Sequence, residues 1–251
     1  MTFWRVVSKA RSTRVALEGL YQGASAYLVG GSPQLLGLDL RLLRMPGCWS
    51  MAINNAAVVF EPDAFIGLDA VSCFNNNIFS NARIQKFLNY ARHDQMIGEK
   101  RACHYPNTLF FDLTDETETF MSEFCRVSGP LPFWKNTFFT ALACLYQLGF
   151  KRVYLIGCTF DLSGEAYAHD QKISDVSRKM NEKLYRDTVE KIKTLYPMLM
   201  DEGMELLTCH RSTPLEGAVP FISFEDSISM VTTESNSIEF NFYRHALEES
   251  K

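Results

Sequence analysis

The feature that most constrains the fold is a helix that runs into a strand through a single glycine near the middle of the chain. Residues 138–148 are apolar and rich in alanine and leucine, and they stop at Gly149, a residue type common at helix C-caps. The segment 151–157, Lys-Arg-Val-Tyr-Leu-Ile-Gly, then has the composition of a strand. Because both elements are apolar, each must be buried, and the unit predicts α/β architecture.

Three shorter apolar runs upstream predict further strands, and each ends in residues suited to a ligand. The run 26–29 ends on Gly-Gly-Ser-Pro, the run 49–53 on Asn-Asn and the run 64–68 on Asp. In a doubly wound parallel sheet, ligands bind at the carboxyl ends of the strands, beside the point where strand order reverses. We therefore expect one pocket to be lined by Gly30, Gly31, Ser32, Asn54, Asn55 and Asp69. The alternative is that these residues only make turns and caps.

Two later segments are expected to reach the same edge of the sheet. Asn136 and Thr137 begin the apolar helix, where free N–H groups and the positive end of the helix dipole favour an anion. Residues 205–209 form the last predicted strand, and Arg211 in the following loop could pair with a phosphate. A structural turn at this position is the competing interpretation.

The loop 161–170 holds the best candidate for acid–base chemistry. An imidazole such as that of His169 exchanges protons near neutral pH, and a nearby carboxylate can orient it. Asp161 and Glu165 are the candidates for that carboxylate. A surface histidine without a role is the alternative.

The remaining segments complete a single predicted domain. We expect an amphipathic N-terminal helix at 5–22, a helical stretch around 84–92, a long amphipathic helix over 177–200 and a C-terminal extension at 218–251. The long helix is interpreted as a packing element whose inward residues are Tyr185, Val189, Ile192 and Leu195.

Net charge and cysteine content limit the classes of function and the cell compartment that we expect for this chain. The 251 residues carry a formal net charge of −4, which gives no support for a protein that coats nucleic acid. The seven cysteines include no Cys-x-x-Cys pair, so we expect reduced thiols and a cytoplasmic protein. No apolar run approaches the roughly 18 residues needed to span a bilayer. An acidic run predicts a solvated face rather than a metal site; it comprises Asp112, Asp115, Glu116 and Glu118.

The order of these motifs resembles the small bacterial sialyltransferases that use CMP-sialic acid. It also resembles a wider group of Rossmann-like proteins, many of them in phages, related to the archaeal hydroxymethylpterin diphosphokinase. The resemblance spans residues 26–170 and is carried by the Gly-Gly-Ser-Pro turn, the strand that ends on Asn-Asn, and the segment 148–161, LGFKRVYLIGCTFD.

The resemblance implies a Rossmann-like fold with a nucleotide held across the strand ends. By position, Gly31, Ser32 and Asn54 would contact the nucleotide, Asn136 and Thr137 the donor, and Tyr167 the leaving phosphate. The family carries its catalytic histidine further along the chain, in a segment where this sequence, over 171–208, has no histidine.

Together these observations predict a glycosyltransferase that moves a sugar from a nucleotide-sugar to a hydroxyl acceptor. His169, Tyr167 and Asp161 are the predicted catalytic residues, and no cofactor is required. One alternative is a Mg-ATP-dependent diphosphokinase of a small hydroxymethyl compound, with Asp69 or Asp161 holding Mg²⁺. Another is a nucleotide-binding protein without catalysis. The nucleotide base, the acceptor and the oligomeric state are left open.

Overall fold

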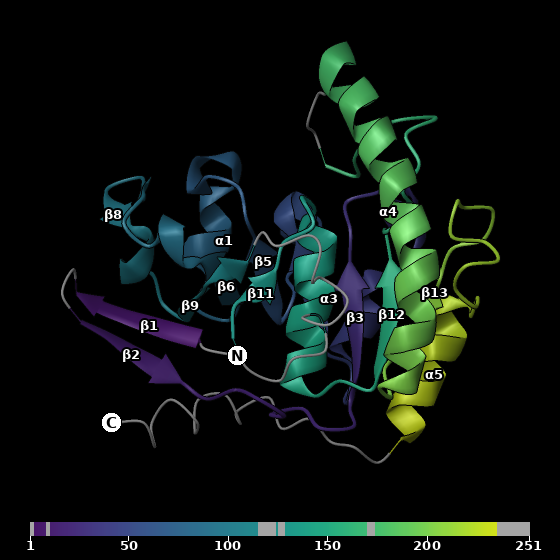
Figure 1. Ribbon diagram of the computed structural model, residues 1–251, viewed down its shortest axis with the longest axis horizontal. Helices are drawn as coiled ribbons and strands as arrows, with labels where there is room; N and C mark the ends of the chain where they lie inside the picture. Colours follow the sequence, from purple (N-terminus) through teal and green to yellow (C-terminus); the bar gives the residue numbers. More distant parts are fainter. Residues whose placement is uncertain (1–2, 9–10, 115–123, 125–128, 170–173, 235–251) are drawn as a thin grey trace.

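The chain is organised around one large, mostly parallel sheet (Figure 1). The computed structural model describes residues 3–8, 11–114, 124, 129–169 and 174–234. Within these residues, nine strands lie in the order β13-β12-β3-β4-β5-β6-β9-β1-β2. Neighbouring strands from β13 to β9 are parallel, whereas β1 is antiparallel to both β9 and β2. The strands are β1 (Phe3–Ser8), β2 (Arg11–Val15), β3 (Ser25–Val29), β4 (Ser50–Ile53), β5 (Ala64–Gly67), β6 (Gln85–Asn89), β9 (Thr108–Phe111), β12 (Arg152–Ile156) and β13 (Glu205–Thr208).

The path of the chain through this sheet makes it doubly wound. From β3 the chain moves outward through β4, β5 and β6 to β9, and it then returns to the other side of β3 to add β12 and β13. The strand order therefore reverses between β3 and β12. The predicted α/β, Rossmann-like fold class is confirmed, and the reversal marks the position where such sheets bind ligands.

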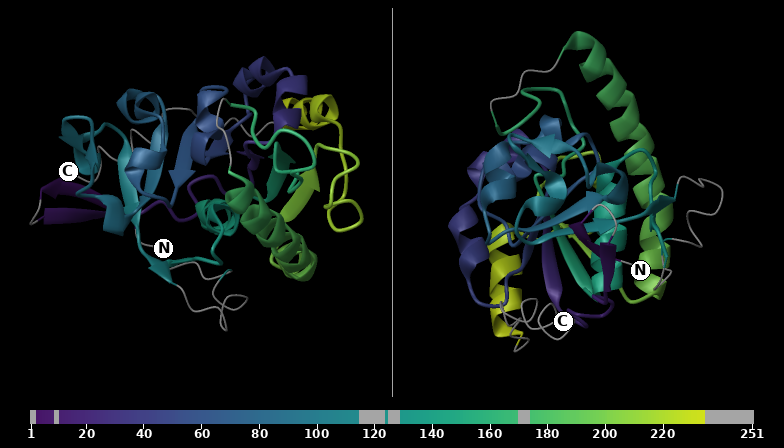
Figure 2. Two further views of the ribbon diagram at one scale, coloured as in Figure 1. Left: turned by 90° about the horizontal axis from the view of Figure 1, so that it is seen from above. Right: turned by 90° about the vertical axis from the view of Figure 1, so that its left-hand side faces the viewer.

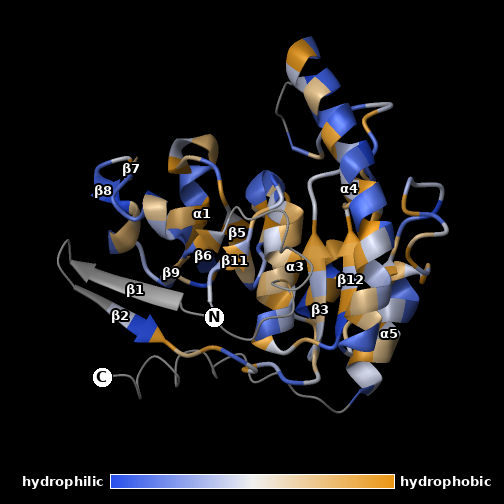
Figure 3. Ribbon diagram, viewed as in Figure 1, coloured by the Kyte–Doolittle hydropathy of each residue, from blue (hydrophilic) through white to orange (hydrophobic). Residues whose placement is uncertain are grey.

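Helices cover both faces of the sheet (Figure 2). The helices α3 (Thr137–Leu148) and α4 (Asp175–Asp201) contribute to one apolar core together with alternate strand residues such as Leu28. The helices α1 (Asn76–Ser80) and α5 (Phe224–Thr233) contribute to a second core on the opposite face, which Tyr27 and Val29 enter. Because β3 is buried on both faces, its sequence is continuously apolar rather than alternating (Figure 3).

The two longest helices begin and end as their sequences predict. Asn136 caps α3 through its side chain, and Gly149 ends the helix in the left-handed conformation, at φ 96°. In α4, Val189, Ile192 and Leu195 are buried and Tyr185 is partly buried, as expected for the inward face of an amphipathic helix. The first turns of α4 project beyond the sheet (Figure 1).

The smaller elements connect these layers. The short strands β7 (Met96–Ile97) and β8 (Lys100–Arg101) pair with each other, as do β10 (Leu113–Thr114) and β11 (Leu131–Pro132). Single turns of 3₁₀ helix occupy Pro33–Gly37, Leu40–Arg44, Asn54–Val58, Val71–Cys73, Tyr90–Arg92 and Ala102–His104. The leucine-rich segment after the Gly-Gly-Ser-Pro turn is thus two short 3₁₀ helices.

The predicted N-terminal helix at 5–22 is wrong, because this segment forms β1, β2 and a turn. Val6, Val7, Thr13 and Val15 are β-branched and favour strands, and pairing of β1 with β9 on one side and β2 on the other satisfies the backbone. Gly19, at φ 70°, also breaks any helix that would reach 22.

One other expectation needs correction. The stretch around 84–92 begins with β6 and becomes helical only as the 3₁₀ turn Tyr90–Arg92. Four of the five residues of β6 are buried, and the mixed charges of the segment concealed its strand character. Within the predicted C-terminal extension, Phe224, Ile228 and Val231 of α5 join the second core. Residues 235–251 lie outside the described residues.

Within the described part of the chain, none of the helices combines the length and the apolar composition that a bilayer crossing requires.

Candidate functional site

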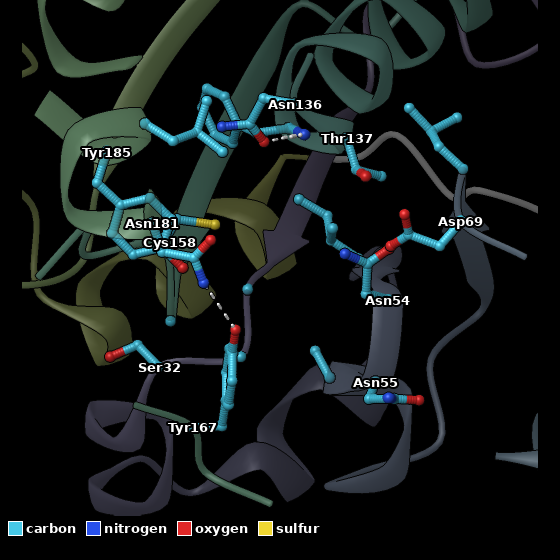
Figure 4. Close-up of a pocket in the computed structure, with 18 of the residues that line it drawn as sticks. Ser32, Asn54, Asn55, Asp69, Asn136, Thr137, Cys158, Tyr167, Asn181 and Tyr185 are labelled. Atoms are coloured by element: carbon cyan, nitrogen blue, oxygen red, sulfur yellow. Dashed lines mark hydrogen bonds between the residues drawn. The ribbon is translucent and has the colours of Figure 1, made fainter. Parts of the chain in front are cut away.

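A cavity of about 540 Å³ opens at the carboxyl edge of the sheet, where the strand order reverses (Figure 4). Its walls come from the ends of β3, β4, β5 and β12, the start of α3, the loop after β12 and the first half of α4. Every predicted site residue except Arg211 lines this cavity: Gly30, Gly31, Ser32, Asn54, Asn55, Asp69, Asn136, Thr137, Asp161, Tyr167 and His169. Their roles in binding and catalysis remain predictions.

The floor of the cavity is a close contact between two glycines from neighbouring strand ends. The Gly30 N–H donates to the Ile156 carbonyl at 2.8 Å, and the Ser32 N–H donates to the Gly157 carbonyl at 3.0 Å. A Cβ on Gly30 would lie 2.3 Å from the Gly157 carbonyl oxygen. Packing therefore requires a glycine at position 30. The N–H groups of Gly30 and Ser32 donate to carbonyl groups at the end of β12, so they are not available to an anion.

Ser32 is likewise engaged within the protein. Its hydroxyl accepts a hydrogen bond from Thr159 Oγ1 at 2.9 Å and donates one to Gln34 Oε1. Gly31, in contrast, faces the loop after β12. A Cβ on Gly31 would lie 3.6 Å from Tyr167 and 3.7 Å from His169, an ordinary contact distance.

The ends of β4 and β5 contribute an amide and a carboxylate. Asn54 adopts the left-handed conformation at φ 53°, and no described residue donates a hydrogen bond to its buried Oδ1. Asn55 braces the loop below, since its Nδ2 donates to the Cys73 carbonyl at 3.0 Å. Asp69 is exposed at the rim. Among the described residues, this wall therefore offers two acceptors, the unpartnered Asn54 Oδ1 and the exposed Asp69 carboxylate.

The start of α3 brings positive potential to the cavity. Asn136 Oδ1 accepts from the Phe138 N–H at 3.0 Å, and Asn136 Nδ2 donates to Thr188 Oγ1 of α4 at 2.9 Å. The Asn136 side chain therefore caps α3 and ties it to α4. The exposed Lys135 immediately precedes the cap and also lines the cavity. Helix dipole and ammonium together favour an anion at this end.

Tyr167 and His169 form an aromatic pair over the glycine turn. Their ring centroids are 5.2 Å apart and their planes differ by 27°. The loop that carries them is pinned by the Ala168 N–H, which donates to the Gly31 carbonyl at 2.8 Å. Asn181 Nδ2 donates to the Tyr167 hydroxyl oxygen at 3.4 Å (Figure 4). Burial raises the pKa of Tyr167, so its hydroxyl stays protonated at neutral pH and can donate a hydrogen bond.

The other two predicted residues have local partners. Asp161 accepts from the backbone N–H and the hydroxyl of Ser163, each at 2.8 Å, which makes a compact turn at the cavity edge. Arg211 is not among the residues that line the cavity; its guanidinium carbon lies 3.8 Å from the centre of the Phe221 ring.

Several residues that line the cavity were not predicted from the sequence to be site residues. Arg92 reaches it from the turn after β6, where its Nε donates to the Leu68 carbonyl at 3.3 Å. Asn181 and Tyr185 reach it from α4. The sequence signal for these two residues was their spacing of four positions, which places Asn181 on the same helix face as Tyr185. That face had been assigned to packing alone.

Within the described residues, no group of three or more His, Cys, Asp and Glu side chains could hold a metal ion. Three members of the acidic run, Asp115, Glu116 and Glu118, lie outside those residues. The six described cysteines are free thiols.

No protein-family model matches the sequence, and no curated protein matches it. Among solved structures, the chain is similar to the sialyltransferase CstII from Campylobacter jejuni, in complex with the substrate analogue cytidine-5'-monophosphate. The two sequences are 13% identical, the match covers 80% of this chain and 85% of that chain, and the TM-score is 0.43.

Proposed function

We propose that this chain binds a nucleotide or nucleotide-sugar in the cavity and transfers the sugar to a hydroxyl acceptor. The observation that carries the proposal is the convergence of the α3 N-terminus, the Asn54 amide and the Tyr167–His169 pair on one cavity at the strand-order reversal. This is the position at which open α/β sheets bind nucleotides. The resemblance of the sequence motifs to the sialyltransferases points in the same direction.

The size and polarity of the cavity suit such a ligand. Its volume of about 540 Å³ falls within the roughly 300–1,000 Å³ typical of small-molecule sites. Lys135 and Arg92 supply positive charge at its wall, and the α3 N-terminus adds backbone N–H groups. A phosphate would therefore be bound at the α3 side, which leaves the apolar and amide groups for the base and the sugar.

The chemistry follows from the two rings. In the transfer, the bond between the sugar's anomeric carbon and a phosphate oxygen breaks, and a bond from that carbon to the acceptor oxygen forms. Tyr167, a neutral hydroxyl, would donate to the phosphate as negative charge develops on it, together with the α3 N-terminus. The His169 imidazole would take the proton from the acceptor hydroxyl. Asp161, at the edge of the same cavity, is the remaining candidate for a catalytic carboxylate.

A second candidate function uses the same cavity differently. Asp69 and Asp161 both line it, so in a diphosphokinase that binds Mg-ATP one or the other carboxylate would help to hold Mg²⁺. A carboxylate and a phosphate donor set meet the ligand preferences of Mg²⁺.

A thermal-shift screen separates these functions. CMP, UDP, GDP and ATP are each added with and without Mg²⁺, and the unfolding temperature is measured. Because a ligand at a hundred times its Kd stabilises the native state by about 2.7 kcal/mol, the correct nucleotide should raise Tm by several degrees. A shift with CMP, UDP or GDP in the absence of Mg²⁺ supports the glycosyltransferase, and a shift only with Mg-ATP supports the diphosphokinase. Absence of any shift contradicts both.

A further inference from the structure

We propose that His210 is a positioning residue for the cavity, because its Nε2 accepts the Gly157 N–H and thereby fixes the backbone on which the glycine turn is built. The hydrogen bond measures 2.7 Å and joins the end of β13 to the end of β12. His210 does not line the cavity itself. The inference rests on the proposed function in so far as the cavity is a nucleotide site.

The first step is the place of Gly157 in the site. It lines the cavity, has φ 62°, and its carbonyl accepts the Ser32 N–H at 3.0 Å. A Cβ on Gly157 would lie 2.4 Å from the Gly30 carbonyl oxygen. The two strand ends are therefore in backbone contact, and any rotation of the peptide before Gly157 would displace Gly30, Gly31 and Ser32 together.

The second step is how His210 holds that peptide. An imidazole nitrogen that accepts a hydrogen bond carries a lone pair, so His210 is neutral with its proton on Nδ1. The His210 backbone is set in turn by its own N–H, which donates to Thr208 Oγ1 at 3.3 Å. Protonation of Nε2 would place an N–H against the Gly157 N–H, and the hydrogen bond would be lost.

The third step is the electrostatic setting. Beside the junction, Cys158 follows Gly157, and Cys209 and Arg211 flank His210. Burial raises the pKa of each thiol to about 12, so both thiols stay neutral between pH 5 and 8. His169 lies beyond Gly31, within the cavity. Burial lowers the pKa of His210 below its ordinary 6.5, in keeping with its role as an acceptor.

The lowered pKa sets the direction of the pH dependence. Below pH 6.5 the unfolded chain binds a proton at His210 that the native state does not bind, so the free energy of unfolding falls as pH falls. Once pH passes below the native pKa, His210 is protonated in the folded protein and the Gly157 contact is broken. Nucleotide binding should therefore weaken on the acidic side.

Two substitutions distinguish positioning from mere packing. In His210→Gln, an amide oxygen can occupy the Nε2 position and accept the Gly157 N–H without titrating, whereas His210→Asn is too short to do so. At pH 7.5 we expect His210→Asn to weaken nucleotide binding about three- to tenfold, the effect of one lost hydrogen bond, and His210→Gln to bind as the wild type does. As pH is lowered from 7.5, nucleotide binding by the wild type should weaken relative to His210→Gln once His210 becomes protonated in the folded protein. Comparison at one pH cancels the titration of the nucleotide itself.

The experiment combines calorimetry with NMR of the full chain. CMP is titrated into each protein, or whichever of UDP, GDP and ATP gives the largest thermal shift, and His104→Gln, which changes an exposed histidine, serves as the matched control. The ¹⁵N shifts of His210 in the ligand-free wild type should show a neutral ring protonated at Nδ1 at pH 7.5. Three results would each overturn the inference: a neutral ring with its proton on Nε2, a charged ring, or wild-type affinity in His210→Asn. If no nucleotide binds the wild type, the proposed function fails, while the His210 tautomer still decides the contact with Gly157.

Discussion

At the scale of single residues, the site is made from side chains that are held in place by the protein itself. The Tyr167 and His169 rings stack, the Ala168 N–H anchors their loop to Gly31, and Asn181 donates to the Tyr167 oxygen. Because Asn181 supplies a donor, the Tyr167 proton remains available for a phosphate. The His169 ring stacks on Tyr167. A smaller side chain at position 169 should therefore remove the imidazole and leave the other walls of the cavity in place.

Substitution of His169 by alanine should separate binding from turnover. We expect the release of nucleotide from the sugar nucleotide to fall by about 10²–10⁴, the usual contribution of a general base, while the thermal shift with the free nucleotide is retained. His104→Ala, at an exposed histidine, is the matched control and should leave both unchanged. Wild-type turnover in His169→Ala would remove His169 from the mechanism.

The sequence predicted that these residues line one cavity, but it did not predict the contacts that hold them in place. Glycines, amides and a carboxylate after short strands were enough to predict one pocket wall, since strand ends share an edge. The hydrogen bond of Asn136 with Thr188 could not be predicted, because the two residues are 52 positions apart in sequence and meet only when α3 and α4 pack together. The contact of His210 with Gly157 spans 53 positions and likewise leaves no local pattern.

At the scale of elements, the ends of β3 and β12 are the part of the sheet on which the site depends. Their glycines allow the backbones to touch, and hydrogen bonds between the two ends close the cavity floor. The elements that the sequence predicted correctly, such as α3, combine apolar composition with recognisable caps. The errors fall on β1, β2 and β6, where charged residues interrupt the apolar pattern and strand pairing outweighs local preference.

Substitution of Gly30 by alanine tests this junction. The new Cβ would lie 2.3 Å from the Gly157 carbonyl oxygen, so the strand ends must separate, at a cost of about 1–3 kcal/mol in the free energy of unfolding. Gly37→Ala is the matched control, because no atom lies within 4 Å of a Cβ built there. Urea unfolding should show a lower midpoint for Gly30→Ala and an almost unchanged midpoint for Gly37→Ala. Equal midpoints for both variants would contradict the proposed contact.

At the scale of the whole molecule, the doubly wound order of the sheet explains why the site lies where it does. The chain leaves β3 in one direction and returns to its other side as β12, so the loops after these strands diverge and open a cavity between them. The helices α3 and α4 close this cavity from one face of the sheet. The fold class followed from the sequence because several of the parallel strands, such as β3, β4 and β5, are largely apolar, whereas the position of α4 over the cavity depended on tertiary packing.

A crystal structure of the chain with the nucleotide that stabilises it most tests the central claim most directly. We expect the nucleotide in the cavity between the ends of β3 and β12, with its phosphate oxygens about 3 Å from donors at the α3 N-terminus and its other groups near Asn54. Tyr167 and His169 should face the phosphate, on the side where the sugar would be attached. A nucleotide bound elsewhere on the molecule, with the cavity empty, would contradict the claim.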